Sequence, residues 1–161
     1  MKTRSLAAAA ALTASLIGLS QVGVAAAPPE GLVINAHPCV FAPVETGPWE
    51  ADGALSDHGT FVRTSAAVSP PDAGFFDVRT FREEFLFTGA AGTFTVQAEE
   101  SSVGAQTRVW QIGFGTGAYA DTRGHGTAAF FTTEEPNACT KGFRNFTFAL
   151  TGVASKVGQA S

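Results

Sequence analysis

From residue 28 onward, apolar and polar side chains alternate in short runs that are separated by Gly, Pro, Asp and Asn. Alternation with a period of two is typical of β-strands that bury one face. No long segment repeats apolar residues at helical spacing, so βαβ units with crossover helices are not expected. About eight strands are predicted, over residues 32–34, 49–55, 59–65, 81–88, 93–99, 108–114, 127–133 and 143–153.

The clearest hairpin joins residues 81–88 to residues 93–99, because the linking residues 89–92 carry Gly at both ends. Earlier in the chain, Pro38, Pro43 and Pro48 are expected to interrupt regular structure. Strands without crossover helices indicate an all-β fold, and eight strands suffice to close a small barrel. We therefore expect one domain, residues 28–161, folded as an eight-stranded antiparallel barrel without an evident internal repeat.

Residues 1–27 have the layout of a secretory signal peptide. A positively charged start is followed by an uncharged Ala/Leu-rich stretch and then by the small residues Ala25–Ala27. A transmembrane anchor is the alternative, since the apolar stretch approaches the length that spans a bilayer. No basic cluster follows the stretch, which favours cleavage. We expect a secreted protein that keeps no membrane anchor after cleavage.

The charge of the chain argues against a nucleic-acid partner. Charged residues make up 15% of the sequence and the formal net charge is −4, so a broad basic surface is not expected. The 14 Phe residues instead predict an aromatic core.

Two cysteines, Cys39 and Cys139, lie near opposite ends of the predicted domain. In an exported chain an even number of cysteines indicates a disulfide bond. A metal-binding pair and a catalytic thiol are the alternatives, but neither cysteine belongs to a CxxC motif. We expect the Cys39–Cys139 disulfide.

Strand alternation also places charged residues on the predicted apolar faces. Glu83 shares a face with Phe81 and Phe85, and Arg108 shares one with Trp110. Within a cavity, such charges would orient a ligand and hold each other ionised. At strand ends they would instead lie in water at the rim of the barrel. The charged residues placed in this way are Glu83, Glu100, Arg108 and Arg144.

No motif in the chain specifies a metal ion or a cofactor, and none is expected. His37, His58 and His125 lack metal-ligand spacing, and no GxSxG nucleophile motif occurs. Residues 115–120 satisfy the loose GxGxxA pattern, but they lie between two predicted strands rather than at the start of a helix. The glycines there are expected to form a tight connection.

Two segments resemble the C-terminal half of the allene oxide cyclase and dirigent barrel families. They are residues 115–124, with the sequence GTGAYADTRG, and residues 145–154, with the sequence NFTFALTGVA. The resemblance covers roughly residues 80–154 and extends to secreted bacterial proteins of the same barrel type that have no assigned activity. It implies an eight-stranded antiparallel barrel of the calycin type with a hydrophobic lumen. Members of these families are often trimeric, so a homo-oligomer is an open expectation.

The resemblance also implies roles for two residues. Arg123 matches the Arg of the dirigent A-R-G segment, which lies at the pocket end of those barrels, although Thr122 replaces the Ala. Tyr119 occupies the aromatic position of the turn. The cyclase activity itself is not implied, because the other functional residues of these families have no assigned counterparts here.

We therefore expect a secreted barrel that binds a small hydrophobic molecule. The alternatives are a cofactor-free cyclase or isomerase acting in the barrel lumen and a non-catalytic structural or surface protein, and binding is favoured over catalysis. The ligand-pocket candidates are Glu83, Arg108, Trp110, Tyr119 and Arg123.

Overall fold

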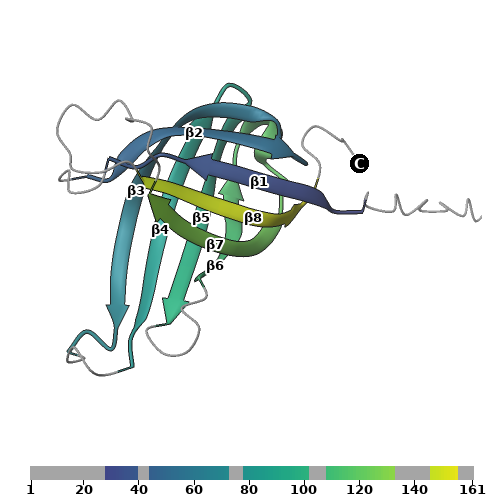
Figure 1. Ribbon diagram of the computed structural model, residues 1–161. Coiled ribbons are helices and arrows are strands. Elements are labelled where there is room, and N and C mark those ends of the chain that lie inside the picture. The colour runs from purple at the N-terminus through teal and green to yellow at the C-terminus, as the bar shows by residue number, and fades with distance from the viewer. Residues whose placement is uncertain (1–27, 40–43, 73–77, 102–107, 133–145, 156–161) are drawn as a thin grey trace, which may run out of the picture.

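The chain forms a closed barrel of eight antiparallel strands in the computed structural model, which describes residues 28–39, 44–72, 78–101, 108–132 and 146–155 (Figure 1). Each strand pairs with its neighbours in the sequence, and β8 pairs with β1 to close the barrel. The strands are β1 (Glu30–Ala36), β2 (Thr46–Gly53), β3 (Asp57–Ser69), β4 (Thr80–Gly89), β5 (Gly92–Ser101), β6 (Arg108–Gly115), β7 (Gly124–Thr132) and β8 (Phe146–Ala154).

The all-β, eight-stranded antiparallel barrel predicted from the sequence is confirmed. The expected signal peptide at residues 1–27 lies outside the described residues. So does Cys139, and the expected disulfide with Cys39 therefore stays a prediction. One local expectation was wrong, because Pro48 lies within β2. It is tolerated there because it lies just beyond the last residue that β1 pairs with β2, where the Pro48 carbonyl still accepts a hydrogen bond from the His37 amide (2.9 Å).

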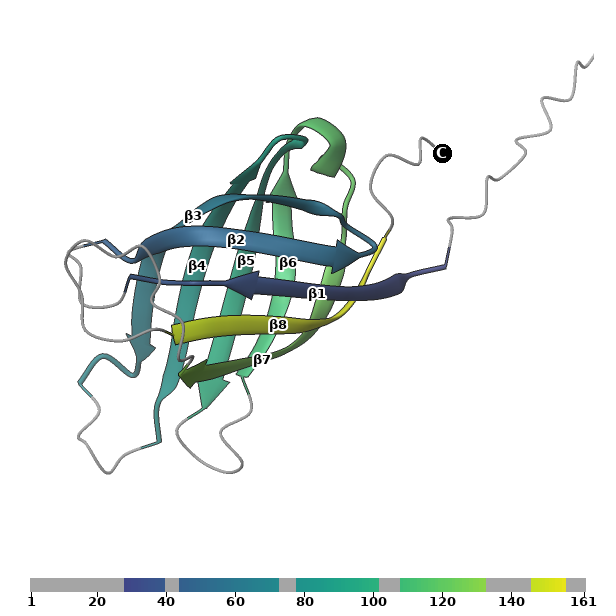
Figure 2. The same ribbon diagram turned by 45° about the horizontal axis from the view of Figure 1, so that its top comes forward.

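The two ends of the barrel differ in their connections. Strands β1, β3, β5 and β7 end, and strands β2, β4, β6 and β8 begin, at the same end of the barrel, which we call the mouth. At the opposite end, the closed end, β4 turns directly into β5, and the 3₁₀ helix η1 (Gly117–Tyr119) follows β6 (Figure 2). Residues Glu30 and Ala154, at the outer limits of β1 and β8, also pair at the closed end.

Side chains fill the lumen between these ends. Phe87 stacks on Phe94 with ring centroids 5.0 Å apart, and both rings contact Trp49 edge-on. Eight aromatic residues that are each at most 2% exposed form this packed interior: Trp49, Phe61, Phe85, Phe87, Phe94, Trp110, Tyr119 and Phe148. The hydrophobic lumen expected from the resemblance is therefore a packed core rather than an open cavity.

Two equivalent rows of residues cross the barrel, one in each half. The first row runs through Ala36, Trp49, Gly59 and Gly89 on β1 to β4. The second row runs through Ala98, Trp110, Gly126 and Gly152 on β5 to β8. The same residue types thus recur in the same register, an internal repeat that the sequence did not make evident.

Each tryptophan bonds to two backbone carbonyls across its row. The Trp49 indole N–H donates to the carbonyls of Thr60 (3.2 Å) and Thr88 (3.1 Å). The Trp110 indole N–H donates to those of Thr127 (2.9 Å) and Thr151 (3.3 Å).

Glycine is required where the strands of each row come close together. A Cβ atom on Gly59 would lie 1.9 Å from the Thr88 carbonyl oxygen, and one on Gly126 would lie 2.0 Å from that of Thr151. The glycines therefore leave these carbonyls open to the indoles.

Replacing either tryptophan by Phe removes the N–H donor and part of the packed ring. We expect Trp49→Phe to lower the free energy of unfolding by about 2–4 kcal/mol, because two backbone carbonyls lose their indole partner and a cavity remains. Trp110→Phe should cost a similar amount, since its two indole-to-carbonyl hydrogen bonds repeat those of Trp49. Urea denaturation measures both.

The control for these variants is Val33→Ala on the outer face of β1. Val33 is 41% exposed, so its replacement should change stability by no more than about 1 kcal/mol. A tryptophan variant that loses no more than this control would contradict the structural role of the indoles.

Candidate functional site

A hollow of about 400 Å³ opens at the mouth of the barrel. Its walls come from the inner faces of β3 to β6, where those strands approach the mouth connections. The lining residues are Ala66, Ala67, Val68, Phe81, Glu83, Glu100 and Arg108. The hollow thus combines small and aromatic apolar groups with three ionisable side chains.

A β-bulge in β3 decides which residues of that strand face the hollow. The pairing of β3 with β4 shifts by one residue between Arg63 and Ser65. After the shift, Ala66 lies opposite Glu83 and Val68 lies opposite Phe81. Without the bulge, the alternation that begins at Arg63 would turn the other face of β3 inward.

Glu83, Glu100 and Arg108 form the floor of the hollow and belong to a wider ion-pair network. Arg108 pairs with Glu83 (2.9 Å) and with Glu100 (2.5 Å). Arg63 pairs with the second oxygen of Glu83 (3.0 Å) and with Glu45 (2.8 Å). Glu83 therefore bridges the two guanidinium groups.

Much of this network is shielded from water. The side chain of Arg108 is 14% exposed and that of Glu83 is 17% exposed. Burial raises the pKa of the Glu45 carboxyl and the nearby Glu83 carboxylate adds to the effect, whereas Arg63 and Arg108 oppose it. Because buried charges are costly without partners, the network depends on every pair being kept.

An aromatic residue extends the site onto β7. The guanidinium of Arg108 lies 4.4 Å from the ring centroid of Phe130, which is a cation–π contact. The ring of Phe130 also stacks on that of Phe148, with the two centroids 4.5 Å apart. Phe130 is nevertheless 40% exposed, so its ring offers apolar surface beside the charged floor.

The structure brings together some of the predicted site residues. Glu83, Glu100 and Arg108 meet in one network, whereas Arg144 lies outside the described residues. Trp110 faces the same lumen but is 2% exposed, and its N–H is bonded to the backbone, so it belongs to the packed core.

Tyr119 and Arg123 lie at the closed end, away from Glu83 and Arg108. Tyr119 is buried against Phe94 and donates its hydroxyl to Asp57, which also accepts from the amide of Ala91 (3.1 Å). These contacts close the barrel below η1. The exposed Arg123 donates to the carbonyl of Thr122 (2.8 Å) and lines neither hollow.

The hydrogen bond between Asp57 and Tyr119 shifts the pKa values of these two groups in opposite directions. Burial raises the pKa of the Tyr119 hydroxyl, and the hydrogen bond to Asp57 and the charge of Asp57 raise it further. Burial also acts to raise the pKa of Asp57, but the hydrogen bonds from Tyr119 and from backbone amides together lower it.

Sequence reasoning missed Glu45, Arg63 and Phe130. The alternation Phe61–Arg63 could have placed Arg63 on the inner face, and Ala128–Phe130 could have placed Phe130 there. No pattern marks Glu45, which precedes β2 and reaches the network because its carbonyl accepts from the Arg63 amide (2.8 Å).

Comparison with known proteins adds no further assignment. No protein-family model, curated protein or solved structure matches the chain. Within the described residues, His, Cys, Asp and Glu form no group of three that could hold a metal ion. No helix in that part of the chain is long and apolar enough to cross a membrane.

The raised pKa of Tyr119 predicts a loss of stability in alkali. An acid with a raised pKa in the folded state stabilises the fold below its unfolded pKa, about 10, and loses this contribution as the pH rises further. Above that pH, the free energy of unfolding should fall by up to about 1.4 kcal/mol per pH unit from this group. Denaturation across the alkaline range measures it.

Tyr119→Phe is the matched variant, because it keeps the ring and removes the ionisable hydroxyl. The free energy of unfolding of this variant should fall less at alkaline pH than that of the native protein. Tyr119 is the only tyrosine in the chain, so the tyrosinate absorbance reports this residue alone. An identical alkaline slope in both proteins would show that the Asp57–Tyr119 contact does not stabilise the fold.

The ion-pair network predicts that Glu83 contributes more to the stability of the fold than Glu99 does. Glu83→Ala leaves two partly buried guanidinium groups short of a partner, so we expect a loss of about 3 kcal/mol in the free energy of unfolding. Glu99→Ala breaks the exposed Arg82–Glu99 pair on the outer face and should cost less than about 1 kcal/mol. Equal losses, measured by urea denaturation, would contradict the network's role.

Proposed function

We propose that the protein is a secreted binding protein that takes a small, mostly apolar molecule at the mouth of the barrel. The observation that carries the proposal is the hollow of about 400 Å³, which joins apolar walls to a partly buried ion-pair floor. Small-molecule sites typically have this size and combine apolar lining with a few fixed polar groups.

Because the lumen is filled, the proposed ligand would bind at the mouth of the barrel rather than in its interior. Phe61, Phe85 and Phe148 occupy the interior below the floor, so an apolar ligand would rest above them. Val68, Phe81 and Phe130 would contact its apolar body. A single hydrogen-bonding group of the ligand would reach the carboxylates or guanidinium groups of the floor.

The pairing of charges favours binding over catalysis. Glu45, Glu83 and Glu100 are each engaged in an ion pair with a guanidinium group. Such a floor orients a polar group well but gives poor access to a proton donor and acceptor. The cofactor-free cyclase or isomerase therefore remains the second expectation, and no separate observation favours it.

The resemblance to the allene oxide cyclase and dirigent families supports the proposal at the level of architecture. The barrel has the strand number and the antiparallel order that the resemblance implies. Secretion and the Cys39–Cys139 disulfide are parts of the same proposal. They rest on the signal-like residues 1–27 and on the even number of cysteines.

Blocking the hollow tests the proposal. The probe is 1-aminoanthracene, a small apolar fluorophore with one hydrogen-bonding group. We expect the native protein to bind it with a rise in fluorescence. Val68→Trp should weaken the binding by at least about tenfold, because a large ring at this 38% exposed position fills the hollow without removing an ion pair.

The matched control is Val33→Trp, which makes the same change at a 41% exposed position on the outer face of β1. This variant should bind the probe as the native protein does. A native protein that does not bind the probe, or a Val68→Trp variant with unchanged affinity, would reject the mouth as the binding site.

A further inference from the structure

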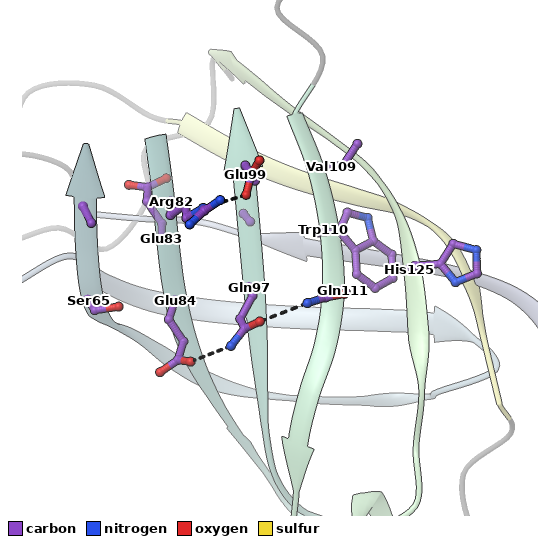
Figure 3. Close-up of a pocket in the computed structure, with 12 residues that line it drawn as sticks. Ser65, Arg82, Glu83, Glu84, Gln97, Glu99, Val109, Trp110, Gln111 and His125 are labelled. Atoms are coloured by element: carbon purple, nitrogen blue, oxygen red, sulfur yellow. Dashed lines mark hydrogen bonds and ion pairs between the residues drawn. The ribbon is translucent and has the colours of Figure 1, made fainter. Parts of the chain in front are cut away.

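A second hollow, of about 590 Å³, lies on the outer face of the barrel across β3 to β7 (Figure 3). It shares Ala67 and Glu83 with the lining of the mouth hollow but lies on the other side of the sheet, because its polar side chains alternate with those that point into the lumen. Gln97 lies between the buried Val96 and Ala98, and Gln111 lies between Trp110 and Ile112.

Hydrogen bonds link the polar side chains of this face into a row. The Gln111 amide donates to Gln97 (3.0 Å), and the Gln97 amide donates to Glu84 (3.2 Å), as the dashed lines of Figure 3 show. Thr64 donates to the other oxygen of Glu84 (3.1 Å). We call Thr64, Glu84, Gln97 and Gln111, which lie on four successive strands, the polar row.

The polar row is ordered although both of its glutamines are exposed. A free glutamine side chain loses considerable rotamer entropy when a ligand fixes it. Here the neighbouring hydrogen bonds fix Gln97 and Gln111 beforehand, which lowers the cost of binding. Each amide carries two hydrogens, and each hydrogen bond in the row uses one of them, so donor capacity remains for a ligand.

The chemistry of this face excludes several classes of ligand. Its one guanidinium group, that of Arg82, is paired with Glu99 (2.8 Å), and Glu84 adds a second carboxylate, so phosphate groups would be repelled. A peptide strand cannot extend the sheet, because the closed barrel has no free edge. The face therefore presents a line of uncharged amides together with carboxylates. Such groups can donate to and accept from the hydroxyl groups of a neutral ligand.

The spacing of the polar row fits a linear ligand with a regular repeat. Adjacent strands lie about 4.8 Å apart, which is close to the length of one hexose ring in an extended glycan. Val109, which is 49% exposed, lies beside the row on β6 and would contact the C–H face of a sugar ring.

We propose that the outer hollow binds an extended neutral glycan. The glycan runs across β4, β5 and β6, and successive sugar rings contact Glu84, Gln97 and Gln111. The mouth and its ligand take no part in this binding.

Cellotetraose, an extended neutral tetrasaccharide, is the probe. We expect the side-chain amide signals of Gln97 and Gln111 to shift in NMR spectra as millimolar cellotetraose is added. Gln97→Ala and Gln111→Ala should each weaken the binding about fivefold to tenfold in calorimetric titrations. Maltotetraose, which has the same sugar in a curved chain, should bind more weakly.

Two controls separate this site from the rest of the molecule. Glu50→Gln changes an exposed outer residue on β2 and should leave the affinity unchanged, as should Val68→Trp in the mouth. The proposal is overturned if millimolar cellotetraose shifts neither amide signal. It is also overturned if the two glutamine variants bind as the native protein does, or if Glu50→Gln weakens the binding as much as they do.

Discussion

The indole-to-carbonyl hydrogen bonds of Trp49 and Trp110 constrain how the interior of the barrel is filled. Each indole reaches two strands beyond its own, so each one ties three strands together through a side chain. A large ring can lie there only where the facing strands carry glycine, and the aromatic stack fills the volume that remains. Because the interior is filled in this way, a ligand can enter only at the ends of the barrel or lie on its outer face.

Carboxylate charges are stabilised in different ways at the two ends of the barrel. At the closed end, one carboxylate accepts hydrogen bonds from a hydroxyl and from backbone amides, so the charge is stabilised by neutral donors. At the mouth, carboxylates and guanidinium groups neutralise each other. The closed end uses amides of a short connection between strands. The mouth instead uses the long side chains of arginine and glutamate.

Much of the fold follows from strand alternation, because alternation reports which face of a strand is buried. It predicted the strand number and the inward positions of Glu83 and Arg108. It could not show that the lumen is full, since that depends on how rings from opposite walls interlock. The roles of Tyr119 and Arg123 were inferred from a resemblance, but which end of the barrel they occupy depends on connectivity. Glu45 was missed because it lies outside any strand, where alternation has no meaning.

The bulge in β3 also bears on how the mouth can change over evolutionary time. Beyond Arg63, this strand presents Ala66 and Val68 to the hollow only because one extra residue offsets its pairing. Deleting that residue would exchange the inner and outer residues over the last part of β3, while the other seven strands kept their own alternation. A single codon gained or lost at this point therefore changes the lining of the hollow in one step, without any substitution in the core.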